Sequence, residues 1–250
     1  MREHPGVEPA QESSGSLEAA RKLTELGKIP DVLAVADYGV ITNLLMPDYA
    51  SGYVTFASNA MVLVYTDRSA HAAEINGENW WRILLRPEVR WGHSNPALDP
   101  NGYRTLMVFQ LAERHYGEPG LSRRLEQATH DRFVRPSEAQ LIGLIQAGEL
   151  DYAWSYRSLA TTGGLRWVSL PRAIDLSDTA RAVEYAHARV RLPGPRLAGD
   201  SVDFRGEPIV YAMTIPTGAA HRATAEAFVR FVLSPAGRDI LERAGFIVPR

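Results

Sequence analysis

The chain contains no cysteine among its 250 residues, which excludes disulfide bonds, thiolate metal sites and a cysteine nucleophile. No apolar run approaches the length of a membrane span. The first residues, MREHPGVEPAQESSGS, contain no apolar stretch of signal-peptide type, so we find no export signal in the sequence as given. The net charge is −2, and no basic run is interleaved with aromatic residues. We therefore expect no nucleic-acid partner.

Enzyme motifs are also missing. The sequence has no GxSxG, HExxH, P-loop or GxGxxG motif. Its seven histidines show no metal-ligand spacing, and six of them are scattered over different segments (His71, His93, His115, His130, His187 and His221). We therefore expect neither an enzyme nor a resident cofactor.

What is present is an alternation of helical and strand patterns, which favours an α/β protein with largely parallel strands. Two long apolar strand segments, near 53–66 and 207–215, bracket a middle block. This arrangement predicts two lobes joined by two crossover strands: lobe 1 from 1–58 and 207–250, and lobe 2 from 59–206. The Pro-, Gly- and Arg-rich stretch 186–206 is predicted to be a loop or hinge.

Two stretches resemble the mouths of anion sites. SNPALDPNGYR (94–104) leads into a predicted helix, and helix N-termini attract anions, yet Asp99 places a negative charge there. In ESSGSLEAARK, Gly15 lets the backbone approach a ligand, and Ser16 offers a hydroxyl at another helix start. A simple N-cap is the simpler explanation for Ser16, and the anion-site interpretation stays open beside it.

Two further residues stand at suggestive places. Glu138 lies in the first turn of a helix predicted over 138–147, with Ser137 as its cap. A favourable interaction with the helix dipole is the simpler explanation. Tyr156 lies on the same side of a predicted strand as Tyr152, where most tyrosines serve packing.

Long blocks of the chain resemble the archaeal-type tungstate/molybdate-binding proteins of ABC importers. The resemblance begins at HPGVEPAQESSGSLEAARKLTELGKIPDVLAVADY and continues through YASGYVTFASNAMVLVYTDRS, EINGENWWRILLRPEVRWGHSNPALDPNGYRTLMV and QAGELDYAWSYRSLA. It resumes at GEPIVYAMTIP and ends with VRFVLSPAGRDILERAGF. The family implies the two-lobed type II periplasmic-binding-protein fold, with two crossover strands as hinge and an oxoanion in the cleft.

The resemblance also implies roles for particular residues. Two carboxylates of the family approach the metal atom of the oxoanion and raise its coordination from tetrahedral to octahedral, and these correspond to Asp99 and Glu138. Ser16 matches a serine that contacts an oxygen of the anion. The cleft tyrosine of related molybdate binders corresponds to Tyr156, and the loop motif adds Gly102 to the oxoanion contacts.

This ligand set would explain the acid in the helix mouth. Tungsten and molybdenum at high oxidation state prefer oxygen donors and accept six of them. Sulfur in sulfate and phosphorus in phosphate do not readily accept additional oxygen ligands. For these anions Asp99 would only be a source of repulsion. At about 4 Å such a repulsion costs on the order of 4 kcal/mol at an effective dielectric near 20. The two carboxylates would therefore also select against the wrong anion.

The chain departs from the family at two places. Relatives begin with a signal peptide, a strand and a loop with a second oxygen-binding serine, and we expect that this chain lacks that segment of roughly 35 residues, about one strand-helix unit. Between Gln127 and Arg135 the chain is also shorter than many relatives. We expect this difference to affect a surface flap rather than the site.

The sequence therefore predicts a monomeric, extracytoplasmic solute-binding protein that carries tungstate or molybdate to ABC permease subunits, without catalysis. The alternatives are a binding protein for another oxoanion, an intracellular oxoanion-sensing module and a non-functional truncated fragment. The sequence does not rank tungstate against molybdate.

Overall fold

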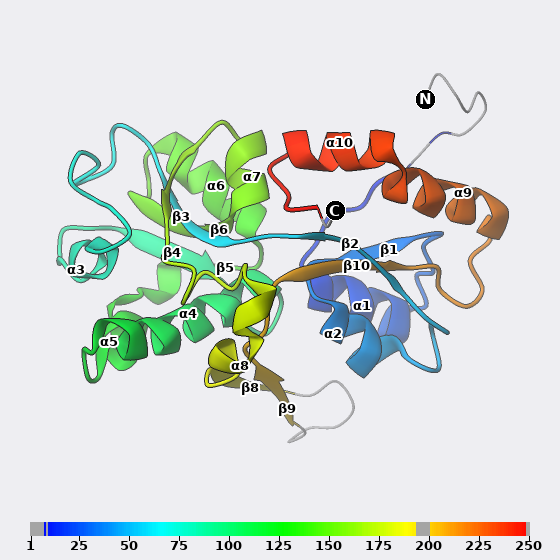
Figure 1. Cartoon of the computed structure of the whole chain (residues 1–250), viewed down its shortest axis with the longest axis horizontal. Helices are drawn as coiled ribbons and strands as arrows, with labels where there is room; N and C mark the ends of the chain where they lie inside the picture. Colours follow the sequence, from blue (N-terminus) through cyan, green and yellow to red (C-terminus); the bar gives the residue numbers. More distant parts are fainter. Residues whose placement is uncertain (1–7, 9, 194–200, 249–250) are drawn as a thin grey trace.

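The computed structural model describes Glu8 and residues 10–193 and 201–248. It has two lobes, each built around its own sheet (Figure 1). One sheet has the strand order β1-β10-β2, formed by Leu33–Val35, Val210–Thr214 and Val54–Ser58. The other has the order β5-β4-β6-β3-β7, formed by Val134–Arg135, Trp91–Ser94, Tyr152–Tyr156, Met61–Tyr65 and Arg166–Ser169. The prediction of a two-lobed α/β fold is confirmed.

Helices cover both faces of each sheet (Figure 1). On the three-stranded sheet, α1 and α2 lie on one face and α9 and α10 on the other; on the five-stranded sheet, α4 and α5 lie opposite α6 and α7. The bounds are α1 Ser16–Leu26, α2 Tyr38–Val40, α3 Trp80–Leu84, α4 Pro100–Tyr116, α5 Leu121–Ala128, α6 Glu138–Ala147, α7 Arg157–Thr162, α8 Ala182–Tyr185, α9 Arg222–Leu233 and α10 Pro235–Arg243. A single π-helical turn, Ile41–Leu45, continues α2.

The apolar stretch predicted as one strand near 53–66 divides between the two lobes. Strand β2 pairs with β10 in one sheet, and β3 pairs with β6 and β7 in the other. Asn59 stands at the changeover, fully buried, and its side chain bonds the Ala60 N–H and the Ser158 hydroxyl. The chain therefore crosses between lobes at this point, and β10 runs beside it. The exact lobe boundaries remain a prediction.

The expectation of largely parallel strands is wrong. Among the strand pairs of the described residues, β4–β5 and β4–β6 are parallel and the other five are antiparallel. Four of these five pairs involve β3 or β10, which arrive from the other lobe and run against the direction of their neighbours, and the fifth is the hairpin β8–β9. A helix-strand alternation in sequence does not reveal this reversal.

The expectation of a loop or hinge over 186–206 is also corrected. Arg189–Pro193 and Ser201–Arg205 form strands β8 and β9 of an antiparallel hairpin, while 194–200 lie outside the described residues. Side chains along β8 alternate between exposed and buried, so the arginines face water while Val190 and Leu192 pack inward. The high proline and arginine content concealed this period-two pattern.

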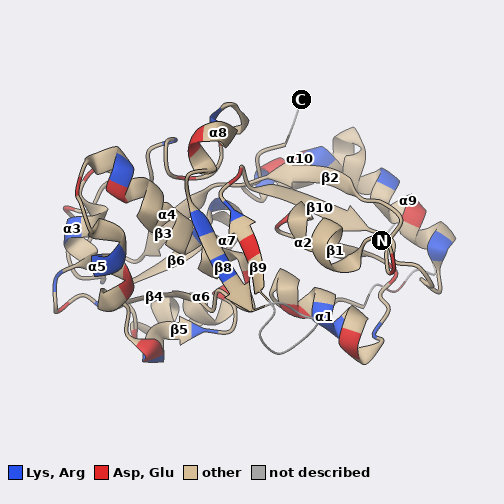
Figure 2. Cartoon of the chain, turned by 90° about the horizontal axis from the view of Figure 1, so that it is seen from below, with Lys and Arg blue, Asp and Glu red and all other residues tan. Residues whose placement is uncertain are grey.

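Most predicted helices form where expected, including α4, α5 and α6. One cap differs: α1 begins at Ser16 itself, with Gly15 as its N-cap. Acidic and basic residues are interspersed along helices such as α1 and α9 and along the hairpin β8–β9 (Figure 2). None of the helices in the described part of the chain combines the length and the apolar character needed to cross a membrane.

Candidate functional site

Asp99 lies where two helix N-termini meet. It is the N-cap of α4, and its Oδ1 accepts a hydrogen bond from the Asn101 N–H at 3.0 Å. Its Oδ2 accepts from the Glu138 N–H, the first residue of α6, at 3.1 Å. The residue is 6 % exposed. The carboxylate therefore receives N–H donors and the positive ends of two helix dipoles, which explains how an acid is accommodated in this loop.

Glu138 places a second carboxyl group beside the first. Its Oε1 accepts from the Ser155 hydroxyl at 2.5 Å and from the Tyr156 N–H at 2.6 Å. Both bonds end on Oε1, so among the described residues Oε2 is the oxygen left for a ligand. Burial, followed by the charge of Asp99, raises the pKa of Glu138 to about 8. Burial also raises the pKa of Asp99.

Ser16 comes to this pair from the other lobe. A Cβ on Gly15 would lie 2.3 Å from the Leu98 carbonyl oxygen and 3.2 Å from the Asp99 Cα, so the start of α1 lies directly against the Asp99 loop. Only glycine permits this approach. The Ser16 hydroxyl oxygen accepts from the Ala36 N–H at 3.0 Å, which leaves its proton free to be donated. Ser16, Asp99 and Glu138, far apart in sequence, thus meet at one place.

Tyr156 ends β6 and is buried beside Glu138. Its hydroxyl oxygen accepts a hydrogen bond from the Arg104 guanidinium at 2.9 Å. Burial raises the pKa of Tyr156 well above its usual value, so the phenol keeps its proton. Because arginine can only donate, the Tyr156 proton is available to another acceptor.

Gly102 lies in the first turns of α4, and its N–H donates to the Asp99 carbonyl at 3.0 Å. An added Cβ would lie 2.3 Å from the Ser94 carbonyl oxygen and 2.6 Å from the Pro96 nitrogen. The glycine therefore lets α4 pack against the loop before it. Close packing therefore explains why position 102 is a glycine. A direct contact between Gly102 and an anion remains a prediction.

Sequence patterns missed several residues around the pair. Arg104 is 2 % exposed, and its guanidinium also donates to the Ala36 carbonyl. Ser155 holds Glu138, as described above. Asn101 is fully buried; its Oδ1 accepts from Ser94, and its Nδ2 has no hydrogen-bond partner among the described residues. The only signal for these residues was their place within SNPALDPNGYR or next to Tyr156.

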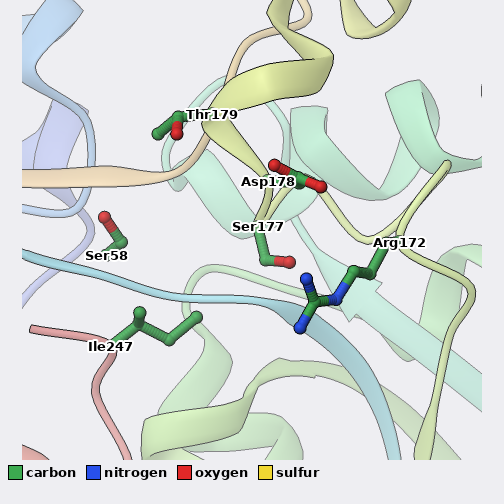
Figure 3. A pocket seen from close by; sticks show the side chains of 6 residues that line it. All are labelled: Ser58, Arg172, Ser177, Asp178, Thr179 and Ile247. Atoms are coloured by element: carbon green, nitrogen blue, oxygen red, sulfur yellow. The ribbon is translucent and has the colours of Figure 1, made fainter.

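A cavity of about 280 Å³ lies elsewhere, lined by Ser58, Arg172, Ser177, Asp178, Thr179 and Ile247 (Figure 3). Two of its polar side chains are engaged within the protein: the Ser177 hydroxyl donates to Asp175, and the Asp178 carboxylate accepts from the Ala180 N–H. Within the described residues, no group of three or more histidine and acidic side chains is arranged to hold a metal ion. Asp99 and Glu138 are thus a pair, not a metal-cation cluster.

Two buried carboxyl groups thus lie at the N-termini of α4 and α6, and the start of α1 from the other lobe packs against the loop that carries one of them. The family model of the bacterial extracellular solute-binding proteins matches residues 1–247, and the chain belongs to this family. An uncharacterised solute-binding protein of Petrotoga mobilis is 44 % identical over 97 % of this chain and 75 % of the relative. The molybdate/tungstate-binding protein WtpA of Pyrococcus abyssi is 37 % identical over 92 % of this chain and 71 % of its own length.

Solved structures share the fold. The periplasmic molybdate-binding protein of Azotobacter vinelandii superposes with a TM-score of 0.70 at 18 % identity, covering 98 % of this chain and 90 % of that one. The sulfate-binding protein SubI of Mycobacterium tuberculosis gives 0.67 at 15 % identity, covering 97 % and 76 %. At these identities the likeness establishes the two-lobed periplasmic-binding-protein fold, which confirms the predicted fold class.

Proposed function

We propose that this protein captures molybdate or tungstate between its lobes and delivers it to the permease of an ABC importer. The observation that carries the proposal is the pair of buried carboxyl groups, Asp99 and Glu138, at the meeting of α4 and α6 and beside Ser16. The relative that binds molybdate and tungstate, at 37 % identity, supports the same ligand class.

The chemistry of the pair favours these anions. In the proposed complex, Ser16 and Tyr156 donate protons to the outer oxygens, while Asp99 and Glu138 address the metal centre. Molybdenum(VI) and tungsten(VI) accept two additional oxygen donors, whereas sulfur in sulfate does not. The same two carboxylates would repel sulfate and phosphate, since both anions offer only negatively charged oxygens to them.

Glu138 would bind the metal as a carboxylate. Its pKa of about 8 means that it largely holds a proton at neutral pH before binding. Entry of the metal centre would therefore displace that proton, and metal binding would be accompanied by proton release. We infer no catalysis; the protein would act as a monomeric, extracytoplasmic binding component.

Isothermal titration of the 250-residue chain with molybdate, tungstate, sulfate and phosphate tests the proposal. We expect tight binding of the first two, with sulfate and phosphate at least about 1,000-fold weaker, equivalent to about 4 kcal/mol of discrimination. Titration in two buffers of different ionisation enthalpy would reveal the released proton. Sulfate binding as tight as molybdate binding would contradict the proposal.

A second candidate function, the binding of another oxoanion, is favoured by one observation, the fold shared with a sulfate-binding protein. The same titration separates the two, because a sulfate site would bind sulfate most tightly. A preference for sulfate would also leave the two acids without a purpose.

A further inference from the structure

Arg104 stands between the two lobes. It belongs to α4, which packs on the five-stranded sheet (Figure 1), and it contacts Ala36 and Asp37, the two residues that follow β1 of the three-stranded sheet. Its Nη1 donates to the Ala36 carbonyl at 2.6 Å and to the Tyr156 hydroxyl at 2.9 Å. Its Nη2 lies 3.3 Å from Oδ2 of Asp37. One side chain therefore bonds three acceptors drawn from both lobes.

Asp37 is built to receive this arginine. It is 4 % exposed, and its Oδ1 is already fixed by the Gly39 N–H at 2.8 Å, as the N-cap of α2. Its Oδ2 accepts from Arg104 and from the hydroxyl of Tyr103, the residue before Arg104 on α4. Two neighbouring residues of one lobe thus converge on one carboxylate oxygen of the other.

The network also joins the proposed ligand contacts. The Ala36 peptide is held on its N–H side by Ser16 and on its carbonyl side by Arg104. Arg104 in turn holds the Tyr156 oxygen, so that the tyrosine proton faces elsewhere. A continuous chain of bonds therefore runs from Ser16 through Ala36 and Arg104 to Tyr156.

We propose that Arg104 is the closure residue of this binding protein: it fastens the lobes around the ligand through Ala36 and Asp37, and it orients the Tyr156 hydroxyl toward the oxoanion. This proposal rests on the proposed function for the identity of the ligand. The opening and closing of the lobes can be tested without it. In an opened cleft, Arg104 and Asp37 would separate and face water. Closure would form the ion pair, so the pair would govern how long the cleft stays shut.

The kinetics follow from this placement. Removing one partner of a buried, hydrogen-bonded charge pair acts mainly on dissociation. We expect the Arg104→Met variant to release molybdate at least about 30-fold faster, the change that corresponds to about 2 kcal/mol. Its association rate should stay within about threefold, because the entry of the anion precedes closure. Arg104→Lys keeps the positive charge but not the planar, forked guanidinium group. It should therefore recover part of the time for which molybdate stays bound.

Lobe spacing gives a readout that does not need the ligand. The chain has no cysteine, so Leu26→Cys in α1 and Arg123→Cys in α5, both exposed, would attach a fluorescent donor and acceptor specifically. In the ligand-free protein, Arg104→Met should shift the distance distribution toward the open form. Asp37→Asn should do the same, since asparagine retains the oxygen that caps α2 but not the charge.

The matched control is Arg90→Met. Arg90 also pairs with an aspartate, Asp151, at 3.2 Å, but both residues belong to the same lobe. It should change neither molybdate release nor lobe spacing. Unchanged release and spacing in the Arg104 and Asp37 variants would overturn the proposal, and so would equal effects in the Arg90 variant.

The outcomes for closure and for the proposed function are separable. If the unaltered chain binds neither molybdate nor tungstate, the proposed function fails. The distance between the lobes in the ligand-free protein still tests whether Arg104 holds them together. If Arg104→Met does not fold, Arg104→Lys and Asp37→Asn carry the same comparison. A spacing shift confined to these interlobe variants supports closure by Arg104.

Discussion

Two pairs of buried ionisable side chains lie close together in this molecule. One pair joins a base to an acid, whereas the other joins two acids. Arg104 and Asp37 carry opposite charges, and each satisfies the other across the lobes. Asp99 and Glu138 are both carboxyl groups, so they repel each other when both are ionised, and among the described residues their hydrogen-bond partners are backbone N–H groups and one hydroxyl, with no ion pair to either. The first pair is complete within the protein, whereas the second pair lacks a positive centre.

The difference explains what each pair is suited to do. A buried pair of opposite charges stabilises one arrangement of the chain and is costly to break from one side. Burial instead raises the pKa of both carboxyl groups of the second pair, and the charge of Asp99 raises the pKa of Glu138 further, so that Glu138 keeps a proton which a ligand can displace. A metal atom of high oxidation state, arriving within an oxoanion, would supply the positive centre that this second pair lacks.

Replacing an acid of the second pair should produce the largest change. Glu138→Gln keeps the shape of the side chain but removes the carboxylate, so molybdate affinity should fall by at least about 100-fold, or about 3 kcal/mol. Asp99→Asn should act in the same direction. Above pH 8, where Glu138 has lost its proton, the ligand-free Glu138→Gln protein should melt at a higher temperature than the unaltered protein, because the like-charge repulsion is gone.

Calorimetric titration and thermal unfolding would measure both effects together. Glu149→Gln, an exposed acid two residues after α6, serves as the control and should change neither quantity. Unaltered affinity in both the Glu138 and the Asp99 variants would move the site elsewhere.

The next largest effect should be the dependence of the free energy of unfolding on pH, which distinguishes the acid pair from the ion pair. The pKa of Glu138 is raised from 4.5 to about 8 on folding, so its proton stabilises the folded form below pH 4.5 and progressively less as the pH rises through 8. Between pH 6 and pH 8 the ligand-free protein should lose about 2 kcal/mol in its free energy of unfolding. Urea unfolding measures this slope. The slope should persist in Arg90→Met and disappear in Glu138→Gln. A flat profile in the unaltered protein would contradict the raised pKa of the buried Glu138 carboxyl group.

The contact between lobes at Gly15 predicts a smaller effect. A methyl group there would meet the Leu98 carbonyl at 2.3 Å and push α1 away from the Asp99 loop. We expect Gly15→Ala to weaken molybdate binding by about tenfold and to lower the unfolding free energy by about 1–3 kcal/mol. Gly143→Ala is the control, since a Cβ at that helical position meets nothing within 4 Å and should be neutral or stabilising. Equal behaviour of the two variants would show that the close approach is unimportant.

The smallest expected effect concerns Tyr156, which touches both pairs. Tyr156→Phe removes one donor to the oxoanion and one acceptor of Arg104, so affinity should fall by about fivefold to tenfold. Combined with Arg104→Met, the losses should be less than additive, because the two residues share one hydrogen bond. Fully additive losses would indicate that Arg104 does not act through Tyr156.

The sequence was sufficient to predict most helices and the candidate site residues. It was not sufficient to predict which strands and which side chains pair with one another. Helix α6 begins at Glu138 and ends before Gly148 as its pattern predicts, because local spacing and a left-handed glycine set both ends. The resemblance brought Ser16, Asp99 and Glu138 forward together, and the structure brings them to one place. Their roles as ligands remain predictions.

What sequence could not provide was long-range in origin. The direction of β3 depends on its arrival from the other lobe, and the hairpin β8–β9 depends on pairing rather than composition. Arg104 stands in the quoted motif, yet nothing local distinguishes it from an exposed arginine. Its partners Ala36 and Asp37 lie nearly seventy residues earlier, so only the folded chain reveals the bridge.

X-ray absorption at the molybdenum K-edge tests the central claim most directly. On the proposed function, the bound molybdate should show six oxygen neighbours, four from the anion and two at longer distance from Asp99 and Glu138. The Glu138→Gln variant should show fewer neighbours. Four equal oxygen neighbours in the unaltered protein, as in free molybdate, would contradict the account.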